Sequence, residues 1–415
     1  MTQRIGDLVI GAGAIGVNCA YALADSGRDV VLVDQGTVCS GCSHGNAGWV
    51  TPCHLLPLPG PGLVWQTLKW MLRADSPLYI KPSLQPELLA WLWRFYRHCN
   101  KAAQLRGLAS LVEMNRHVVP MTRELIERHR LDCQFRHRGV LYLFESPAGF
   151  EKGIREYELQ AEYGVAGEVL SAAEVRQREP VVGDNISGGI AYTDDSDCVP
   201  DQFVKQLAGV LPGLGVRILE NAEVVDIGLS GAHIDQIVTS AGTFRPENIV
   251  LAAGAWTVRL ARRLGLHLSM QPGKGYSITL RRQTGVPARP LNLSEVKVAV
   301  TPWRDTIRLA GTMELAGLQL TINQPRVDAI VRAAKCYLPH FQADQVLEVW
   351  TGMRPVCSDD LPIVGRTTRC DNLILATGHG MLGLTQAVVT GRLVADLVTK
   401  REPLVPVEPL SPDRF

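Results

Sequence analysis

The stretch Asp7-Leu8-Val9-Ile10-Gly11-Ala12-Gly13-Ala14-Ile15-Gly16 stands near the start of the chain, and Val30-Val31-Leu32-Val33-Asp34 follows it. The pattern predicts a buried strand, a glycine turn, a helix from about Ala14 to Ser26 and a second strand that ends in a carboxylate. Glycine turns also occur in proteins that bind nothing. The full order of strand, turn, helix, strand and acid is nevertheless typical of a dinucleotide-binding unit.

The three glycines of this turn have separate roles. Gly11 permits the tight turn, Gly13 lets the backbone approach a pyrophosphate, and Gly16 lets the helix pack closely on the strand. The free N–H groups at the start of the helix attract the anion. Asp34 is placed to accept hydrogen bonds from a ribose 2′-OH. An acid at this position disfavours a 2′-phosphate, so the expected nucleotide is FAD or NAD.

Length and composition limit the class of protein. A chain of 415 residues suggests two domains, which are free to interleave. An apolar content of 46% and a net charge of +1 describe a soluble globular protein without the basic block expected of a nucleic-acid-binding protein. No long uncharged apolar run predicts a transmembrane helix. The first strand begins at the N-terminus with no room for a signal peptide, so we expect a cytoplasmic protein with mostly free cysteines.

One group of cysteines is dense enough to suggest chemistry. Cys39, Cys42, His44 and Cys53 lie close together in the sequence, and a CxxC motif with a following histidine can bind zinc or form a redox disulfide. A second CxxC motif is missing. The run from Cys42 to Gly48 is also rich in small residues, which suits a segment that passes beneath a ligand. We therefore expect no metal site here.

Half of the eight tryptophans, Trp65, Trp70, Trp91 and Trp93, lie between residues 63 and 100. Such a stretch suits a pair of helices on a membrane surface, where tryptophan lies at the headgroup level. It equally suits two ordinary helices that pack on the core. We favour the ordinary helices because their polar face is not strongly basic.

The rest of the chain alternates short strands and helices. Ser171–Glu174 is a capping box, which predicts the start of a short helix. Buried strands run into small-residue turns at Ile249–Trp256 and Asn372–Gly380, so both ends of the chain are expected to build one nucleotide site. Alternating residues between about 269 and 310 predict an antiparallel sheet in a separate domain. The other expected helices cover about 109–129, 200–211, 326–337 and 384–398, and the other expected strands 140–144, 216–219 and 223–226.

Six motifs follow one another along nearly the whole chain: Gly11–Gly16, Ser43–Gly48, Pro272–Ser277, Gly311–Glu314, Trp350–Pro355 and Asn372–Gly383. In this order they resemble the FAD-dependent D-amino-acid dehydrogenase branch of the D-amino-acid oxidase family. The order of the motifs is much more specific than any single one of them.

The resemblance implies an α/β flavoprotein of two domains. One is a Rossmann-like FAD-binding domain of the glutathione-reductase type, and the other is an α+β substrate domain built on an antiparallel sheet. The FAD-binding domain is expected to be discontinuous, with residues 1–85, 196–268 and 346–415. Residues 86–195 and 269–345 are expected to form the substrate domain.

The resemblance also implies oxidation of the Cα–N bond of a D-amino acid. Hydride leaves Cα for flavin N5, and water converts the imine into a 2-oxo acid and ammonia. Relatives of this branch differ in whether they prefer cyclic substrates such as D-proline or a hydroxy-D-proline. Oxidation of such a substrate would give a cyclic imine instead of a 2-oxo acid. The electron acceptor would be a quinone or a protein. Such an enzyme would be cytoplasmic or would contact the inner face of the cell membrane.

The resemblance assigns residues to the substrate. Arg354 would hold the carboxylate through two parallel hydrogen bonds. Tyr276 would add a hydroxyl, although a buried structural tyrosine fits the sequence almost as well, and His44 would lie near the flavin. His379 and the amides of residues 380–382 would face the flavin pyrimidine edge. No general base is evident, so catalysis is expected to rest on positioning.

The residues expected to contact FAD come from the glycine turns and the segments beside them. They are Gly11, Gly13, Ala14, Ile15, Gly16, Asp34, Gln35, Ser43, His44, Asn46, Ala47, Gly48, Val224, Ala253, Gly254, Trp256, Gly378, His379, Gly380, Met381, Leu382 and Gly383.

Two other functions fit the same motifs. An oxidase of glycine or sarcosine-like amines would pass its electrons to oxygen and release peroxide rapidly when mixed with substrate. A flavin-holding subunit of a larger electron-transfer assembly would be weak alone and would co-purify with partners. The cysteine group and the tryptophan-rich stretch keep this last hypothesis open.

Overall fold

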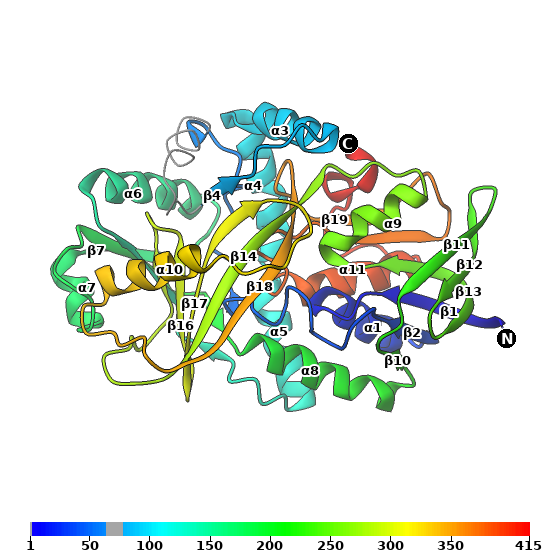
Figure 1. The fold of residues 1–415 in the computed structure, drawn as a ribbon, viewed down its shortest axis with the longest axis horizontal. Coiled ribbons are helices and arrows are strands. Elements are labelled where there is room, and N and C mark those ends of the chain that lie inside the picture. Colours follow the sequence, from blue (N-terminus) through cyan, green and yellow to red (C-terminus); the bar gives the residue numbers. More distant parts are fainter. Residues whose placement is uncertain (1, 64–77) are drawn as a thin grey trace.

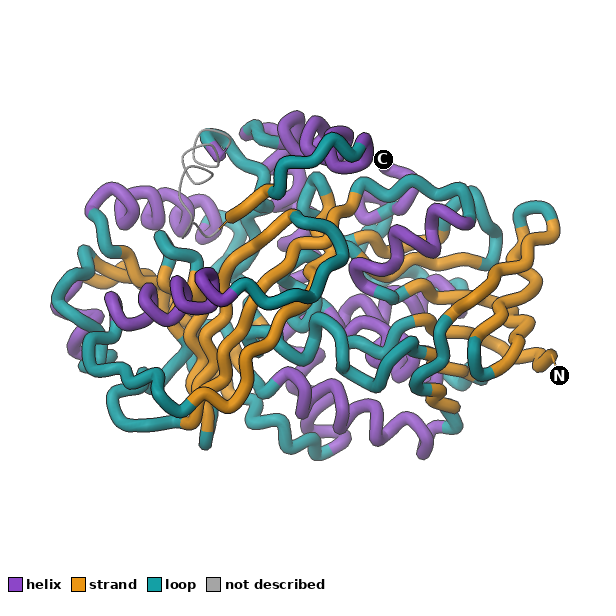
Figure 2. Tube along the Cα trace, in the orientation of Figure 1, coloured by secondary structure: helices purple, strands orange, loops and turns teal. Residues whose placement is uncertain are grey.

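The computed structural model describes residues 2–63 and 78–415, so the expected helix pair between residues 63 and 100 lies partly outside the described residues. Two large sheets, one of eight strands and one of nine, lie side by side (Figures 1 and 2). The expected α/β fold with a Rossmann-like sheet and a second sheet is confirmed. Over the described ranges, no helix combines the length and apolar character that a membrane span requires.

The centre of the eight-stranded sheet is parallel, in the order β10-β2-β1-β13-β20. β2 and β20 are short apolar runs that are buried along their whole length, as expected for a parallel sheet covered on both faces. Antiparallel β11, β12 and β19 extend it. The strands are β1 (Thr2–Ile10), β2 (Val30–Val33), β10 (Arg217–Leu219), β11 (Val224–Ser230), β12 (His233–Thr239), β13 (Gly242–Leu251), β19 (Ile363–Arg366) and β20 (Leu373–Thr377).

Helices from both ends of the chain cover one face of this sheet. α1 packs directly on α11, and the contact depends on Gly391, where a Cβ atom would lie 2.4 Å from the carbonyl oxygen of Asn18. On the opposite face, Leu8 and Leu251 pack with Ala261 of α9. The helices of these two layers are α1 (Ala14–Asp25), α5 (Val118–His129), α8 (Pro200–Val210), α9 (Thr257–Arg263) and α11 (Ala387–Thr399).

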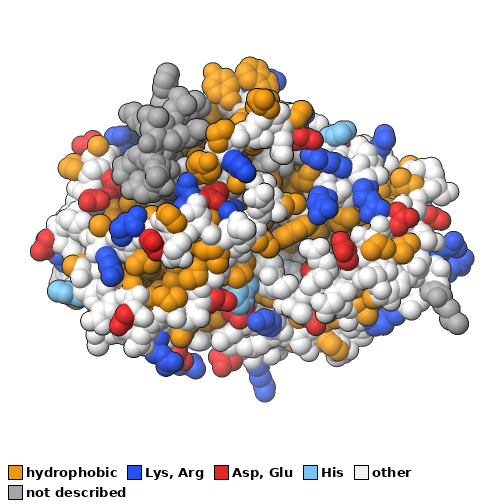
Figure 3. All heavy atoms as spheres, viewed as in Figure 1, with side chains coloured by type: hydrophobic (Ala, Val, Ile, Leu, Met, Phe, Trp, Pro, Cys, Tyr) orange, Lys and Arg blue, Asp and Glu red, His pale blue; other side chains and the backbone are white. Residues whose placement is uncertain are grey.

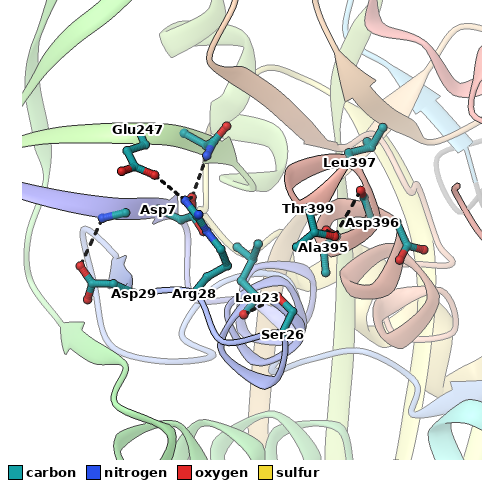
Figure 4. A network of polar contacts seen from close by, with 12 residues as sticks. Asp7, Leu23, Ser26, Arg28, Asp29, Glu247, Ala395, Asp396, Leu397 and Thr399 are labelled. Carbon is teal, nitrogen blue, oxygen red and sulfur yellow. Dashed lines mark hydrogen bonds and ion pairs between the residues drawn. The ribbon is translucent and has the colours of Figure 1, made fainter. Parts of the chain in front are cut away.

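A buried carboxylate ties the central strands together (Figure 4). Asp7 of β1 is fully buried, and its Oδ2 atom accepts a hydrogen bond from Arg28 Nε at 2.8 Å. Arg28 Nη2 also donates to Glu247 of β13 at 2.7 Å, and Asn248 Nδ2 donates to Asp7 Oδ1 at 2.9 Å. Because a buried charge is tolerated only when it is paired, the network holds β1, β13 and the turn before β2 in register.

The nine-stranded sheet is built around three long antiparallel strands, β14, β17 and β18. Its order is β18-β14-β17-β16-β15-β6-β8-β7, with β4 paired to β17. One face packs on α10 through Ile278, Leu309 and Ile330. The elements are β4 (Leu78–Ile80), β6 (Val140–Phe144), β7 (Gly167–Ser171), β8 (Gly188–Tyr192), β14 (Met270–Arg281), β15 (Leu291–Leu293), β16 (Val298–Pro302), β17 (Thr306–Leu315), β18 (Val346–Cys357), α6 (Pro147–Ala161), α7 (Ala172–Arg178) and α10 (Gln324–Tyr337).

One expected helix is wrong. The segment expected to be continuous over 109–129 forms α4 (Lys101–Asn115) and α5, with a break at Arg116 and His117. Pro120 is the third residue of α5. Proline is tolerated in the first turn of a helix but removes a hydrogen bond and clashes in the interior, so a new helix starts here.

The expected capping box is confirmed at the start of α7, where Ser171 and Glu174 satisfy each other's backbone N–H groups. The remaining elements are short or lie at the edge of the molecule. They are α3 (Pro86–His98), a small sheet of β3 (Trp49–Val50), β5 (Arg136–His137) and β9 (Ser196–Asp197), and the 3-10 turns η1 (Leu211–Leu214), η2 (Gly254–Trp256), η3 (Glu408–Leu410) and η4 (Pro412–Arg414).

The residue ranges expected for the two domains stay a prediction, because sheet membership alone does not define a domain boundary. Three segments differ from that expectation. β4, expected in the FAD-binding domain, pairs with β17 of the second sheet, and α5, expected in the substrate domain, packs with α11 on the nucleotide-binding sheet. The third is β18. β18 begins at Val346, where the FAD-binding domain was expected to resume, yet it pairs with β14 along nearly its whole length. The backbone hydrogen bonds of β18 are therefore made to β14 in the second sheet. The chain returns to the nucleotide sheet only at β19.

Candidate active site

The carboxyl ends of the central parallel strands bring the expected nucleotide turns together. Gly11 directly follows β1, Asp34 follows β2 and Gly378 follows β20, while Ala253 lies two residues beyond the end of β13. Parallel strands all end at one edge, and in open α/β sheets ligands bind beyond that edge. Segments from both halves of the chain therefore form one candidate site.

The first turn has no space for side chains. Gly11 has a φ of +110°, and a Cβ atom there would lie 2.5 Å from the carbonyl oxygen of Ala252. A Cβ atom at Gly16 would lie 1.7 Å from the carbonyl oxygen of Gly11. These contacts give the two glycines the turn and packing roles that the sequence predicted.

The start of α1 is open to an anion. Gly13 stands at the N-cap and offers no capping side chain, and the first-turn N–H groups of Ile15 and Gly16 have no helical acceptor. The N–H of Ala14 donates to Ser43 Oγ at 2.8 Å, which places the expected 43–48 segment against the helix start. This donor set fits the pyrophosphate of a dinucleotide such as FAD.

Asp34 is held beside the same turn. Its Oδ2 atom accepts a hydrogen bond from the N–H of Ala12 at 2.6 Å, and its Oδ1 atom accepts one from the N–H of Gly36 at 2.8 Å. A carboxylate oxygen has two acceptor positions, so both atoms keep capacity for a ribose hydroxyl. The neighbouring Gln35 is exposed.

The other expected nucleotide residues lie on segments that adjoin Asp34 or β20. The N–H of Ala222 donates to the carbonyl oxygen of Asp34 at 2.6 Å, and Val224 begins β11 two residues later. Gly254 has a φ of +53°, and its carbonyl oxygen accepts from Thr377 Oγ1 at 3.0 Å. Trp256 closes the same short turn and is partly exposed.

Arg308 is a site residue that sequence reasoning missed. Its side chain is only 4% exposed, and Nη1 donates to the carbonyl oxygens of His44 at 2.7 Å and Asn46 at 2.9 Å. Its Nε atom donates to Thr279 at 3.0 Å. This guanidinium of β17 therefore holds the 43–48 segment against the second sheet. A charged residue within the buried strand Ile307–Ala310 was the available signal.

His44 lies where the two sheets meet. Its Nε2 atom is 2.8 Å from Glu348 Oε1 on β18, and its ring centroid is 6.2 Å from that of Trp350. The next residues of this segment are also fixed: Ala47 accepts from Thr301 Oγ1 at 2.7 Å, and Gly48 has a φ of +81°. The segment therefore passes between the nucleotide turn and β18 with its backbone restrained.

The alternation of β18 and β14 separates Arg354 from Tyr276. Gly275 is the register partner of Gly352, so the even-numbered residues of β18, including Arg354, share a face with the odd-numbered residues of β14. A Cβ atom at Gly275 would lie 2.0 Å from Arg354 Nη1, which confirms that the guanidinium lies on that face. Tyr276 points to the opposite face, into the core beneath α10.

Arg354 has the character of an anion anchor. Its Nη1 atom donates to the carbonyl oxygen of Thr312 at 2.9 Å, and no carboxylate among the described residues lies within ion-pair distance. Enclosure lowers the pKa of the guanidinium from its ordinary value by desolvation, an effect that the nearby Cys42 partly offsets. A largely enclosed cation without a protein counter-charge favours binding of an anionic ligand.

Tyr276 does not lie beside that anchor. It is 1% exposed, and its hydroxyl donates to Glu314 Oε2 at 3.1 Å. Lys274 Nζ lies 2.8 Å from the same oxygen, and Arg326 pairs with the other carboxylate oxygen. The hydroxyl expected at the substrate carboxylate is thus part of a buried ion cluster on the far side of the sheet.

The turn after β20 differs in part from the expectation. His379 is 4% exposed, its Nε2 atom lies 2.9 Å from Thr390 Oγ1, and burial lowers its pKa to about 3, so the ring is neutral and turned into the protein. The N–H of Gly380 donates to the carbonyl oxygen of Pro355, and the N–H of Leu382 donates to the carbonyl oxygen of His379. Of the three amides expected at the flavin edge, only that of the exposed Met381 lacks an acceptor among the described residues.

The remaining glycines of that turn serve its shape. Gly378 has a φ of +76°, and a Cβ atom there would lie 2.5 Å from Cys357 Sγ, while Gly380 has a φ of +52°. A Cβ atom at Gly383 would meet only His379, at 3.9 Å. The turn is thereby packed against the end of β18, next to Arg354.

The cysteine group is divided between two environments. Cys39 is buried, with its N–H donating to Ala12, and Cys42 is partly exposed near Arg354. Cys53 Sγ lies 2.9 Å from Asp195 Oδ2, and burial raises the pKa of that carboxyl to about 7. Within residues 2–63 and 78–415, no group of three metal-ligating side chains is assembled.

Together, a parallel nucleotide-binding core, a second and mostly antiparallel sheet in which only the pairs β15–β6 and β17–β4 are parallel among the described strands, and an anion anchor beside their junction define a two-sheet flavin-dependent oxidoreductase. The model of the family described as FAD dependent oxidoreductase, DAO, matches residues 8–397, and this chain belongs to that family. FAD is accordingly its cofactor.

Curated relatives match the whole chain. A D-amino acid dehydrogenase of Bradyrhizobium diazoefficiens is 33% identical, and one of Vibrio cholerae is 32% identical, with 98% of each chain covered in both comparisons. Among solved structures, glycine oxidase from Geobacillus kaustophilus is 23% identical with a TM-score of 0.80 over all of both chains. L-Proline dehydrogenase from P. horikoshii is 19% identical with a TM-score of 0.77, covering 100% and 98% of the two chains. The structural likenesses establish the fold.

Proposed function

We propose that the protein is an FAD-dependent D-amino acid dehydrogenase. The observation that carries the proposal is the guanidinium of Arg354, which has no ion-pair partner among the described residues and lies near Cys42, next to the 43–48 segment. Full-length relatives that carry the name D-amino acid dehydrogenase support the same reaction and the D configuration. The proposal includes a preference for cyclic substrates, such as D-proline or hydroxy-D-proline, over linear ones.

The residues of this chain act by positioning. The chemistry that FAD supplies is acceptance of the hydride that leaves the substrate Cα. Arg354 binds the carboxylate in a bidentate pair, which fixes the orientation of Cα. Arg308 and Ser43 restrain the segment that separates the nucleotide turn from the substrate sheet. Tyr276 is left out of this mechanism because its hydroxyl bonds to Glu314.

The test is anaerobic bleaching of flavin absorbance by matched D- and L-amino acids, followed by steady-state kinetics with an artificial dye. We expect bleaching by D-enantiomers only. Arg354→Ala should raise KM about 100-fold or more while FAD stays bound, because loss of a charged bidentate pair costs about 3 kcal/mol. Arg128→Ala, which removes an exposed arginine paired with Asp25, is the matched control and should leave KM unchanged. Equal bleaching by both enantiomers would contradict the proposal.

We further propose that the electrons pass to a quinone at a membrane surface on the cytoplasmic side. α3 supports this proposal because Leu89, Trp93 and Tyr96 are all about half exposed or more, and Figure 3 shows apolar side chains gathered at the top of the molecule over α3. Arg94 and Arg97 add positive charge on the same helix. Aromatic residues flanked by cations suit the headgroup region of an anionic membrane.

Co-sedimentation with vesicles tests the membrane contact. We expect binding to vesicles that contain phosphatidylglycerol, weaker binding to phosphatidylcholine alone, and loss of binding in a Trp93→Ser, Tyr96→Ser variant. Equal recovery of the wild type and the variant in the supernatant would argue against α3 as a membrane-binding surface and would favour a protein as the electron acceptor.

A second function keeps support from the fold. A solved glycine oxidase shares the fold over the whole chain, so an oxidase that uses oxygen is the alternative. Stoichiometric peroxide release in air, at the rate of amine oxidation, would favour the oxidase. A rate that depends on added quinone would favour the dehydrogenase.

A further inference from the structure

A tryptophan lies beside the carboxylate anchor. Trp350, Gly352 and Arg354 alternate onto one face of β18, and Gly275 of β14 lies directly opposite Gly352. A Cβ atom at Gly352 would lie 1.8 Å from Trp350 Cη2, just as a Cβ atom at Gly275 would lie 2.0 Å from Arg354 Nη1. Each of the two paired glycines is therefore covered by one of the two side chains.

This arrangement places the indole next to the guanidinium. Cβ positions of directly opposite residues in an antiparallel pair are about 5 Å apart, so the indole edge and the guanidinium are neighbours. The indole also contacts the nucleotide side of the site, because a Cβ atom at Gly45 would lie 1.9 Å from Trp350 Cε3. The ring thus forms a wall between the 43–48 segment and the floor of small residues on β14.

We propose that Trp350 determines which amino acid side chains the enzyme accepts, an inference that rests on the proposed function. A substrate held by its carboxylate on Arg354 has its Cα and side chain against the indole. A flat apolar surface favours a compact apolar side chain, either branched aliphatic or a saturated five-membered ring. The substrate class is therefore small apolar D-amino acids, including cyclic secondary amines.

The groups on the side of Trp350 away from Arg354 provide a second basis for discriminating between substrate side chains. His44 and Glu348 form a pair there, with the His44 ring 6.2 Å from the indole and both side chains partly exposed. A neutral hydroxyl at the end of a compact side chain finds hydrogen-bonding partners at this pair. Glu348 already pairs with His44 at 2.8 Å and with Arg308 Nη2 at 3.8 Å. A side-chain carboxylate of the substrate therefore finds its counter-charges at this pair already taken, so acidic amino acids are poor substrates.

The experiment compares kcat/KM for D-proline, D-valine, D-alanine and D-glutamate in the wild type and in Trp350→Ala. We expect the ratio of D-proline to D-alanine to fall about tenfold, which corresponds to about 1.4 kcal/mol, with the change mainly in KM. Gly352→Ala, whose methyl group displaces the indole while Trp350 is kept, should lower the ratio in the same direction. Val169→Ala, an exposed apolar residue of β7 that the site does not use, is the control.

Binding of unreactive carboxylates gives a readout without turnover. Cyclopentanecarboxylate should bind the wild-type holoenzyme more tightly than acetate, as measured by perturbation of the flavin spectrum, and Trp350→Ala should remove the difference. Unchanged substrate and ligand ratios in both site variants would overturn the role of Trp350. Failure of every amino acid to reduce wild-type flavin would instead contradict the proposed function, and the carboxylate comparison would still test Trp350.

Discussion

At the scale of single residues, two buried charges carry consequences that solution experiments can detect. Asp195 is fully buried, and desolvation raises its pKa to about 7 although Cys53 donates to it. A carboxyl with a raised pKa binds its proton more tightly when folded. Its ionisation therefore lowers stability progressively as the pH rises from about 4 to about 7.

We predict that Asp195→Asn removes part of this pH dependence. The free energy of unfolding of the variant, relative to wild type, should be higher at pH 8 than at pH 5 by at least about 1 kcal/mol. Denaturant titrations at the two pH values measure it. Asp360, whose pKa burial also raises to about 7, stays in both proteins and contributes equally. A difference that is the same at both pH values would show that Asp195 titrates normally.

The second charge is Arg308, whose Nη1 atom donates to two carbonyl oxygens of the 43–48 segment while its Nε atom donates to Thr279. We predict that Arg308→Lys weakens FAD binding about tenfold, because a lysine ammonium cannot reproduce the planar donor geometry. The ratio of flavin to protein absorbance after dialysis against graded FAD measures this change. Arg128→Lys is the matched control, and equal FAD retention in the two variants would remove Arg308 from the site.

At the scale of elements, the glycine turn between β1 and α1 is the most demanding feature. We predict that Gly16→Ala costs at least about 3 kcal/mol or abolishes FAD binding, since its methyl group would lie 1.7 Å from the carbonyl oxygen of Gly11. Gly209→Ala in α8, where a Cβ atom meets nothing within 4 Å, is the control and should be neutral or stabilising by up to about 1 kcal/mol. Equal thermal stability of both variants would show that the turn relaxes freely.

The elements also show what local sequence can predict. The strand and turn from Asp7 to Gly16 were predictable because their signal lies within one short stretch. The opposite faces of Tyr276 and Arg354 were not, because they depend on the pairing register of two strands far apart in the chain. Arg308 acts on carbonyl groups 262 and 264 residues away. The break before α5 has a local signal in Pro120, which stands in the first turn of that helix.

At the scale of the whole molecule, the site is built from segments that only the complete fold assembles. α1 and α11 come from opposite ends of the chain and pack through Gly391. The 43–48 segment is held by Ala14 on one side and by Arg308 on the other. A ligand at this junction contacts groups from both sheets, so its binding energy stabilises the molecule as one unit.

We therefore predict that removal of FAD lowers the unfolding temperature in a single transition and that added FAD restores it. Stabilisation at a free FAD concentration of 100 times Kd should be about 2.7 kcal/mol, because FAD binds the folded state alone. NAD at the same concentration should have no effect, since FAD is the family cofactor. Differential scanning calorimetry of apoprotein over a range of FAD concentrations measures both. Two transitions, with only one shifted by FAD, would mean that the second sheet folds independently and that the Arg308 contact contributes little to coupling the sheets.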